Sequence, residues 1–219
     1  MNQLNAVDNN FIGDADRYLS SNQLSDEELV SMFVENGDEG AFDAIVRRYS
    51  EKVFHIALRI TDNSCDAEEV SQEVFLALYN KAKTFRGDSK FSTWLHRLIT
   101  NASFSLLRKR KKHNEVSLED YLPKFQDDEH HFVRPVVDWS QKVENIVEEK
   151  EIYEIIQKAM NELSPLDKAV VVLSEIEEFT NPDIAEILNL SVAAVKARLH
   201  RSRLFLRGKL TVTLGYSPT

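Results

Sequence analysis

Two segments of the sequence gather the side chains that could bind a polyanion. Although the net charge is −9, residues 81–112 contain ten Lys or Arg residues against one acid, and the chain beyond Glu186 contains six basic residues and no acid. Four aromatic residues lie among the cations of the first block: Phe85, Phe91, Trp94 and Phe104. Such an arrangement suits single-stranded DNA, because bases stack on the rings while phosphates pair with the cations. The simpler alternative is that the cations lie on a solvated helix face, while aromatic rings such as that of Phe91 belong to a hydrophobic core.

The second basic block, residues 182–204, has the pattern of a helix-turn-helix. A short first helix ends at Leu188, and Leu190 fills the turn. The residues expected to face inward on the second helix are Val192, Val195 and Leu199. Those expected to face mostly outward are Ala194, Lys196, Ala197, Arg198, His200, Arg201 and Arg203. A helix of this kind can enter a major groove, with its N-terminal residues near base edges and its later cations on phosphates. Two helices joined by a tight turn also occur in ordinary bundles, which is the alternative.

The sequence offers no pattern for enzyme chemistry. It has no glycine loop that could cradle a phosphate, no nucleophile elbow and no paired carboxylates placed for one pocket. The candidate metal ligands are Cys65, His113, His130 and His131, and their spacing matches no ligand set. We therefore expect no cofactor, no metal site and no enzymatic activity. The rival from that class is an all-α nucleic-acid-processing enzyme, which would need a metal-binding acid cluster.

The composition predicts that helices position these side chains. The 219 residues include 42% hydrophobic and 29% charged residues, with only 6 Gly and 5 Pro, which is typical of a globular protein and unlike a turn-rich all-β chain. The longest apolar run, Ala169–Leu173, is far shorter than the ~20 residues of a membrane span, and the N-terminus shows no export signal. We expect a cytoplasmic protein without membrane insertion.

Apolar residues recur at helical spacing through the N-terminal half, which predicts four helices around a shared core. Ser25 and Glu28 form a capping box at the start of the first helix, and Asp66 with Glu69 is expected to cap the third. The fourth helix is expected over about residues 91–111.

Helical periodicity disappears from Lys112 to about Lys142, where prolines and acids interrupt it, and this segment is expected to be an interdomain linker. Beyond it, Ser164-Pro165 and Asn181-Pro182 each predict a cap followed by a helix. The predicted fold is all-α, with two small helical domains joined by a flexible acidic linker. Its expected divisions are a flexible lead-in (1–23), a four-helix domain (24–112), the linker (113–145), a helix-turn-helix domain (146–210) and a tail (211–219).

Around these motifs the sequence resembles bacterial sigma factors of the extracytoplasmic-function (ECF) type, in the sigma-70 family. Residues 85–101 (FRGDSKFSTWLHRLITN) are similar to their promoter-melting segment, and residues 66–75 (DAEEVSQEVF) are similar to their core-polymerase-binding helix. Three further stretches are similar to their fourth conserved region: residues 163–166 (LSPL), 183–188 (DIAEIL) and 195–203 (VKARLHRSR). The resemblance implies a factor that binds core RNA polymerase, directs it to specific promoters and promotes melting of the −10 element.

The resemblance also implies a role for each group of residues. The core-polymerase-binding residues would be Glu69, Gln72 and Glu73. The residues that bind −10 DNA would be Arg86, Lys90, Thr93, Trp94, Arg97, Asn101 and Arg108. The residues that bind −35 DNA would be Ala194, Lys196, Ala197, Arg198, His200, Arg201 and Arg203. The implied partners are core RNA polymerase, promoter DNA (a −35 duplex and a −10 single strand) and an anti-sigma factor that wedges between the two domains.

The sequence departs from the family pattern near both DNA-binding segments. Ser105 stands where the family usually has Asp, Ala193 and Ala194 stand where Gly and Thr are usual, and Ala197 replaces the usual Ser. Two hydroxyl donors are therefore missing near the −35 contact. The loss of donors that position phosphates should weaken binding more than it changes specificity.

Two alternatives stay open at this stage. The linker acids Asp127, Asp128 and Glu129 are either a solvated spacer or a mimic of RNA that occupies a basic channel of the polymerase. The chain could also be a conventional helix-turn-helix regulator that binds duplex DNA without polymerase. That rival leaves the aromatic-basic segment unexplained, together with the acidic face of the third helix.

Overall fold

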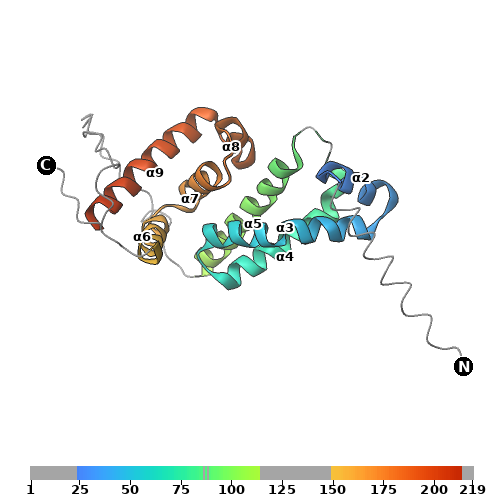
Figure 1. Cartoon of the computed structure of the whole chain (residues 1–219), viewed down its shortest axis with the longest axis horizontal. Helices are drawn as coiled ribbons and strands as arrows, with labels where there is room; N and C mark the ends of the chain where they lie inside the picture. The colour runs from blue at the N-terminus through green and yellow to red at the C-terminus, as the bar shows by residue number, and fades with distance from the viewer. Residues whose placement is uncertain (1–23, 86, 88, 114–148, 214–219) are drawn as a thin grey trace, which may run out of the picture.

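The computed structural model of the chain describes residues 24–85, 87, 89–113 and 149–213 (Figure 1). Over these residues the fold is all-α, as predicted, and it consists of two helical bundles. The lead-in over residues 1–23, Arg86, the linker acids and the last six residues of the tail lie outside the described part. None of the helices in the described ranges combines the length and apolar character needed to cross a bilayer.

The N-terminal bundle contains four α-helices and a short 3-10 turn within the described residues. Their bounds are α2 (Asp26–Asn36), α3 (Glu39–Thr61), α4 (Ser64–Lys81), η1 (Ala82–Thr84) and α5 (Phe91–His113). Ser25 accepts the backbone N–H of Glu28 while the Glu28 side chain reaches back to the Ser25 N–H, so the predicted capping box is confirmed. Gly37 ends α2 with φ 66°, a left-handed conformation that glycine adopts at little cost.

The predicted cap of α4 is wrong. Asn63, not Asp66, is the N-cap, and its side chain accepts the backbone N–H of Asp66 at 3.0 Å. Asp66 is 1% exposed and forms an ion pair with Arg110, near the end of α5. Because the helix begins at Ser64, Asp66 lies inside its first turn, and the residue three places earlier is the cap.

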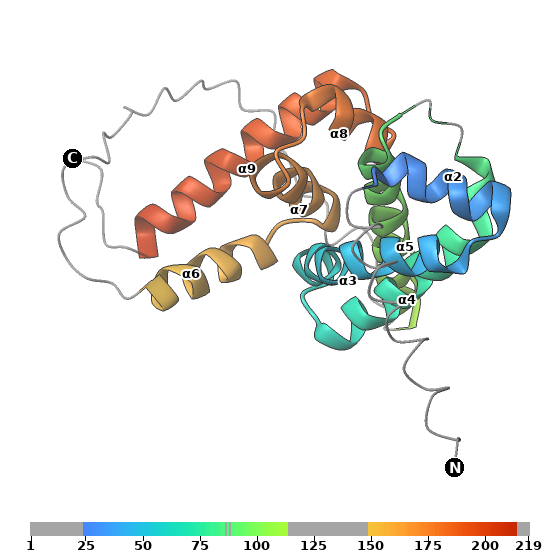
Figure 2. The same ribbon diagram turned by 45° about the vertical axis from the view of Figure 1, so that its right-hand side comes forward.

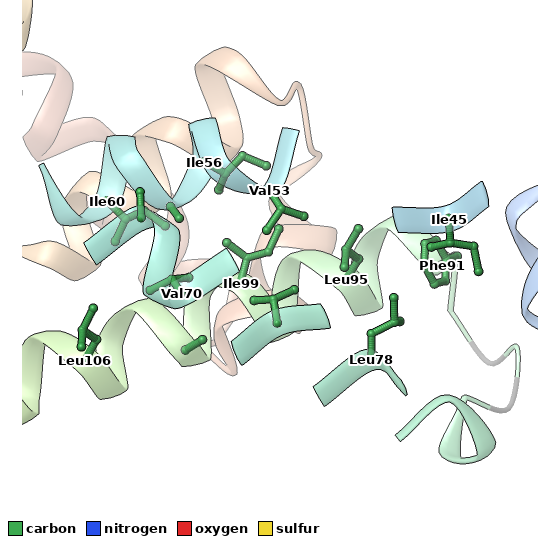
Figure 3. Packing of buried hydrophobic residues seen from close by; sticks show 14 of the residues in the cluster. Ile45, Val53, Ile56, Ile60, Val70, Leu78, Phe91, Leu95, Ile99 and Leu106 are labelled. Atoms are coloured by element: carbon green, nitrogen blue, oxygen red, sulfur yellow. The ribbon is translucent and has the colours of Figure 1, made fainter. Parts of the chain in front are cut away.

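The core of the N-terminal bundle runs between α3, α4 and α5 (Figure 3). Its side chains include Ile45, Val53, Ile56 and Ile60 from α3, Val70 and Leu78 from α4, and Phe91, Leu95, Ile99 and Leu106 from α5. Burial of each such side chain stabilises the fold by roughly 1.5–3 kcal/mol. Because this stripe fixes the rotation of α4 and α5, it also decides which of their residues face outward.

The C-terminal bundle is built from α6 (Glu149–Asn161), α7 (Pro165–Val171), the π-helical turn η4 (Val172–Ile176), α8 (Asn181–Leu188) and α9 (Val192–Thr213). Ser164 caps α7 as predicted, with Pro165 in the first turn. Thr180, rather than Asn181, caps α8 through a capping box with Asp183. Val195 and Leu199 are buried as predicted, but Val192 is 38% exposed, because it opens α9 one turn ahead of the inward stripe.

The two bundles contact each other. Helix α8 lies against α5, and α7 lies against α3 (Figure 2). Ala169 of α7 and Leu188 of α8 pack with the hydrophobic cluster of the N-terminal bundle. This contact bears directly on which predicted site residues are accessible.

Candidate nucleic-acid interface

The predicted polymerase-binding residues share one exposed face of α4. Glu69, Gln72 and Glu73 are all exposed, while the adjacent residues Val70 and Val74 are fully buried. The spacing of three and four residues aligns the three polar side chains along the helix. The asparagine cap and the buried stripe therefore hold two carboxylates and an amide toward the outside.

Sequence reasoning missed Leu76, which extends this same face by one turn. Its side chain is 65% exposed, the most exposed large apolar residue in the described ranges. The seven-residue spacing from Glu69 and the offset from the buried stripe could have revealed it. We call Glu69, Gln72, Glu73 and Leu76 the α4 face. An apolar side chain among carboxylates suits a protein partner better than it suits solvent.

Helix α5 and the loop before it carry the predicted −10 surface. Trp94 is half-buried, and its ring lies 5.3 Å from that of Phe85 and 6.0 Å from that of Phe91, measured between centroids. Phe91 is fully buried, so it belongs to the core, and Trp94 lies at the surface edge of the aromatic cluster. The carboxylate of Glu27 accepts the N–H of Phe91 at 3.3 Å, which ties the start of α5 to α2.

The other predicted −10 residues divide into accessible and covered ones. Lys90, Asn101 and Arg108 are exposed. Thr93 is 4% exposed, and Arg97 is half-buried with its guanidinium donating to the backbone carbonyl of Glu186 at 2.9 Å. The exposed residues thus form a basic strip along α5, and one side of the predicted −10 surface is covered in this arrangement.

The helix-turn-helix is formed by α8, a left-handed turn at Asn189 (φ 53°) and α9. Ser191 accepts the N–H of Ala194 at 3.1 Å and thereby starts α9. Burial of Val195 and Leu199 against α8 then fixes which side of α9 faces outward.

On the outward side of α9, most of the predicted −35 residues are accessible. The exposed ones are Lys196, Ala197, His200, Arg201 and Arg203, while Ala194 and Arg198 are half-buried. Arg198 pairs with Asp167 of α7 at 2.7 Å, and Arg203 pairs with Glu175 at 2.7 Å. Two of the predicted DNA-binding cations therefore also hold the C-terminal bundle together. The residues that depart from the family pattern are half-buried (Ser105, Ala194) or exposed (Ala193, Ala197).

Each of the two bundles matches a known sequence family. The family described as "Sigma-70 region 2" matches residues 45–113, and the family described as "Sigma-70, region 4" matches residues 153–206. The chain belongs to the sigma-70 family of RNA polymerase sigma factors, in its extracytoplasmic-function group. Members of this family are transcription initiation factors that act with RNA polymerase at specific promoters, and they are not enzymes in the usual sense.

Among its relatives, the ECF RNA polymerase sigma factor SigW of Bacillus subtilis (strain 168) is 34% identical over 81% of this chain and 92% of the relative. The ECF RNA polymerase sigma factor SigM of Mycobacterium tuberculosis (strain H37Rv) is 31% identical over 90% of this chain and 88% of the relative.

Two solved structures share the fold. One is the sigma factor RpoE in complex with the anti-sigma factor NepR from Bartonella quintana (TM-score 0.57, 21% identity, 78% of this chain and 97% of that chain). The other is CnrH in complex with the cytosolic domain of CnrY (TM-score 0.59, 21% identity, 86% of this chain and 99% of that chain).

Proposed function

We propose that this chain binds core RNA polymerase through the α4 face, brings it to a particular class of promoters and melts their −10 element. The observation that carries the proposal is the presence of this acidic, leucine-bearing face on the same bundle as the basic strip of α5. Melted DNA would then be held next to the enzyme that must read it. A duplex-binding regulator would need neither surface.

Promoter melting is assigned to the start of α5. Trp94 offers a partly exposed ring for a base, and Lys90, Asn101 and Arg108 offer polar contacts along the same helix. Stacking of a base on an aromatic ring is worth about 1–3 kcal/mol, which is comparable to the cost of taking a base out of the duplex. Thr93, Arg97 and Arg86, which lies outside the described residues, complete the proposed −10 site.

Recognition of the −35 element is assigned to α9. Lys196 and Arg201 would contact phosphates or base edges, with Ala194, Ala197 and His200 beside them. Arg198 and Arg203 would join them while keeping their ion pairs within the bundle.

The two proposed functional units are residues 24–112 and 146–210, joined by the acidic linker. Because one of the two related structures is a complex of a sigma factor with an anti-sigma factor, we further propose that an anti-sigma factor binds this chain. The proposed site of action is the cytoplasm, where core polymerase and promoter DNA are present.

The melting role is tested by permanganate reactivity of promoter thymines in the presence of core polymerase and this protein. We expect −10 thymines to become reactive only when both are present. Replacement of Trp94 by Ala should reduce their reactivity about tenfold, since stacking of one base is lost, while W94F should retain most of it. Equal reactivity with W94A and the wild type would remove Trp94 from the melting site.

A further inference from the structure

A buried polar cluster joins the two bundles at His96. This side chain is fully buried, although it lies on the helix assigned to −10 DNA. Its Nδ1 donates to the backbone carbonyl of Ser92 at 2.6 Å, and its Nε2 lies 3.3 Å from the carboxylate of Glu177, in the C-terminal bundle. Lys52 of α3 pairs with the same carboxylate oxygen at 2.9 Å. One acid of the C-terminal bundle therefore holds two helices of the N-terminal bundle.

The charge state of Glu177 agrees with this geometry. Burial would raise the pKa of its carboxyl, but the hydrogen bonds and charges of His96 and Lys52 outweigh burial and lower the pKa to about 2. The group is therefore an anion at neutral pH, and it is compensated by residues of the other bundle.

The backbone on both sides of Glu177 is irregular. The π-helical turn η4 precedes it, and Glu178 follows with φ 56°, a left-handed conformation that residues other than Gly, Asn and Asp rarely adopt. The turn also brings the Phe179 ring edge-on to the His96 ring, with centroids 4.6 Å apart. Irregular backbone of this kind is costly, and it persists where a particular side-chain placement is required.

A second acid of the C-terminal bundle, Glu186, pairs with Arg97. The guanidinium of Arg97 donates to the Glu186 carbonyl at 2.9 Å and lies 3.6 Å from the Glu186 carboxylate. Figure 2 shows α8, which carries Glu186, lying beside one end of α5. A phosphate approaching Arg97 would meet the negative charge of Glu186.

The contact between the two bundles is partly polar, which should allow the bundles to separate. Thr93, His96 and Thr100 form a buried polar stripe on α5, and the Thr100 hydroxyl donates to the His96 carbonyl within the same helix. Exposure of this stripe to water leaves no hydrogen bond unmade, while the apolar side chains that opening would also expose include Ala169, Leu188 and Phe179. Contacts of this polar kind between domains resemble transient interfaces.

We propose that Glu177 and Glu186 form a latch that closes the C-terminal bundle over α5 in the polymerase-free protein and competes there with promoter DNA. The proposal rests on the assignment of α5 to −10 DNA made above. The ligand that the latch displaces is single-stranded DNA, since Arg97 cannot pair fully with both Glu186 and a phosphate. Binding of core polymerase would release the latch by drawing α8 away from α5.

The latch is tested on the full-length chain without polymerase by fluorescence energy transfer. The one cysteine, Cys65, is exposed on the N-terminal bundle, and Lys158→Cys supplies an exposed partner on α6. We expect the double variant E177Q/E186Q to lower the transfer efficiency. The matched control is E154Q/E162Q, which removes two exposed carboxylates of the C-terminal bundle, one of which pairs with Lys209 in the same bundle. This control should leave the transfer unchanged.

A second readout is the affinity for a fluorescein-labelled single-stranded oligonucleotide of mixed sequence. E177Q/E186Q should bind it about fivefold more tightly than the wild type, and the control pair should not. E186Q alone, at an exposed position, should show part of this gain, which keeps the test valid if the double variant folds poorly.

Unchanged transfer and unchanged affinity in the latch variants would overturn the proposal. An opened chain that fails to support transcription with core polymerase would instead contradict the proposed function, so the two failures are distinguishable.

Discussion

The guanidinium of Arg198 lies 2.7 Å from the carboxylate of Asp167, and this ion pair joins the recognition helix α9 to the first turn of α7. Asp167 also accepts a hydrogen bond from the Ser164 hydroxyl at 2.6 Å. The same cation therefore serves the fold of the C-terminal bundle and lies on the surface proposed to bind −35 DNA.

The two roles of Arg198 are separable by mutating either partner. D167N should cost less than about 1 kcal/mol of unfolding free energy, because the pair is partly exposed, and it should leave −35 binding intact. R198A should cost a similar amount and also weaken binding of a −35 duplex about tenfold. Chemical denaturation and fluorescence anisotropy measure the two effects. If both variants lose DNA binding equally, Arg198 acts only by holding α9 in place.

Replacement of Leu76 by Asp is expected to weaken binding of core polymerase about tenfold or more. The 65% exposed side chain contributes little to the bundle core, so the melting temperature should stay close to that of the wild type. E73A should have a smaller effect in the same direction. Titration of fluorescently labelled protein with core polymerase measures both.

The matched control for this face is E51A, which removes an exposed carboxylate on α3 whose side chain is 88% accessible. Its affinity for core polymerase should equal that of the wild type. An L76D variant with unchanged affinity would show that polymerase binds elsewhere.

Substitutions of two nearby arginines of α5 are expected to have different effects, one on the stability of the fold and the other on DNA binding. Arg110 pairs with the buried Asp66, so R110Q leaves a carboxylate without its cation and should destabilise the fold by about 1–3 kcal/mol. Arg108 is exposed, so R108Q should leave the unfolding free energy unchanged and reduce the affinity for −10 single-stranded DNA. Urea denaturation together with DNA titration tests the pair. A stability loss in R108Q, or none in R110Q, would contradict the assignment.

The contribution of Glu177 to stability is expected to depend on pH. Its pKa is lowered from the ordinary 4.5 to about 2 by His96 and Lys52. A lowered pKa stabilises the folded, closed arrangement above the ordinary value, and this contribution is lost as the pH falls through about 4.5 toward 2. The difference in unfolding free energy between the wild type and E177Q should therefore be largest near neutral pH and decrease as the pH falls through that window. A difference independent of pH would show that the carboxylate charge is not its source.

Much of the fold is predictable from local sequence because its signals are local. The Ser25–Glu28 box, the Ser164 cap of α7 and the inward residues Val195 and Leu199 depend on neighbours within a few positions, and all are confirmed. The predicted cap at Asp66 is wrong because α4 begins at Ser64, and the burial and ion pair of Asp66 depend on Arg110, far along the chain, where local patterns carry no information.

The candidate site likewise combines features that local sequence predicts with features that depend on residues far along the chain. The exposure of Glu69, Gln72 and Glu73 follows from the helical period around the buried Val70 and Val74. The burial of His96 depends instead on Glu177, 81 positions away and on the other side of the linker. A contact between two bundles depends on their relative placement, which no periodicity encodes. The roles of the individual DNA-facing residues therefore stay predictions.

The most direct test of the central claim is run-off transcription with purified core polymerase on a pool of promoter fragments from the genome that encodes this chain. Discrete transcripts that appear only when the protein is added are the expected result, and their upstream sequences would define the −35 and −10 elements. The absence of such transcripts, with DNA binding retained in the absence of core polymerase, would contradict the account and favour a conventional helix-turn-helix regulator.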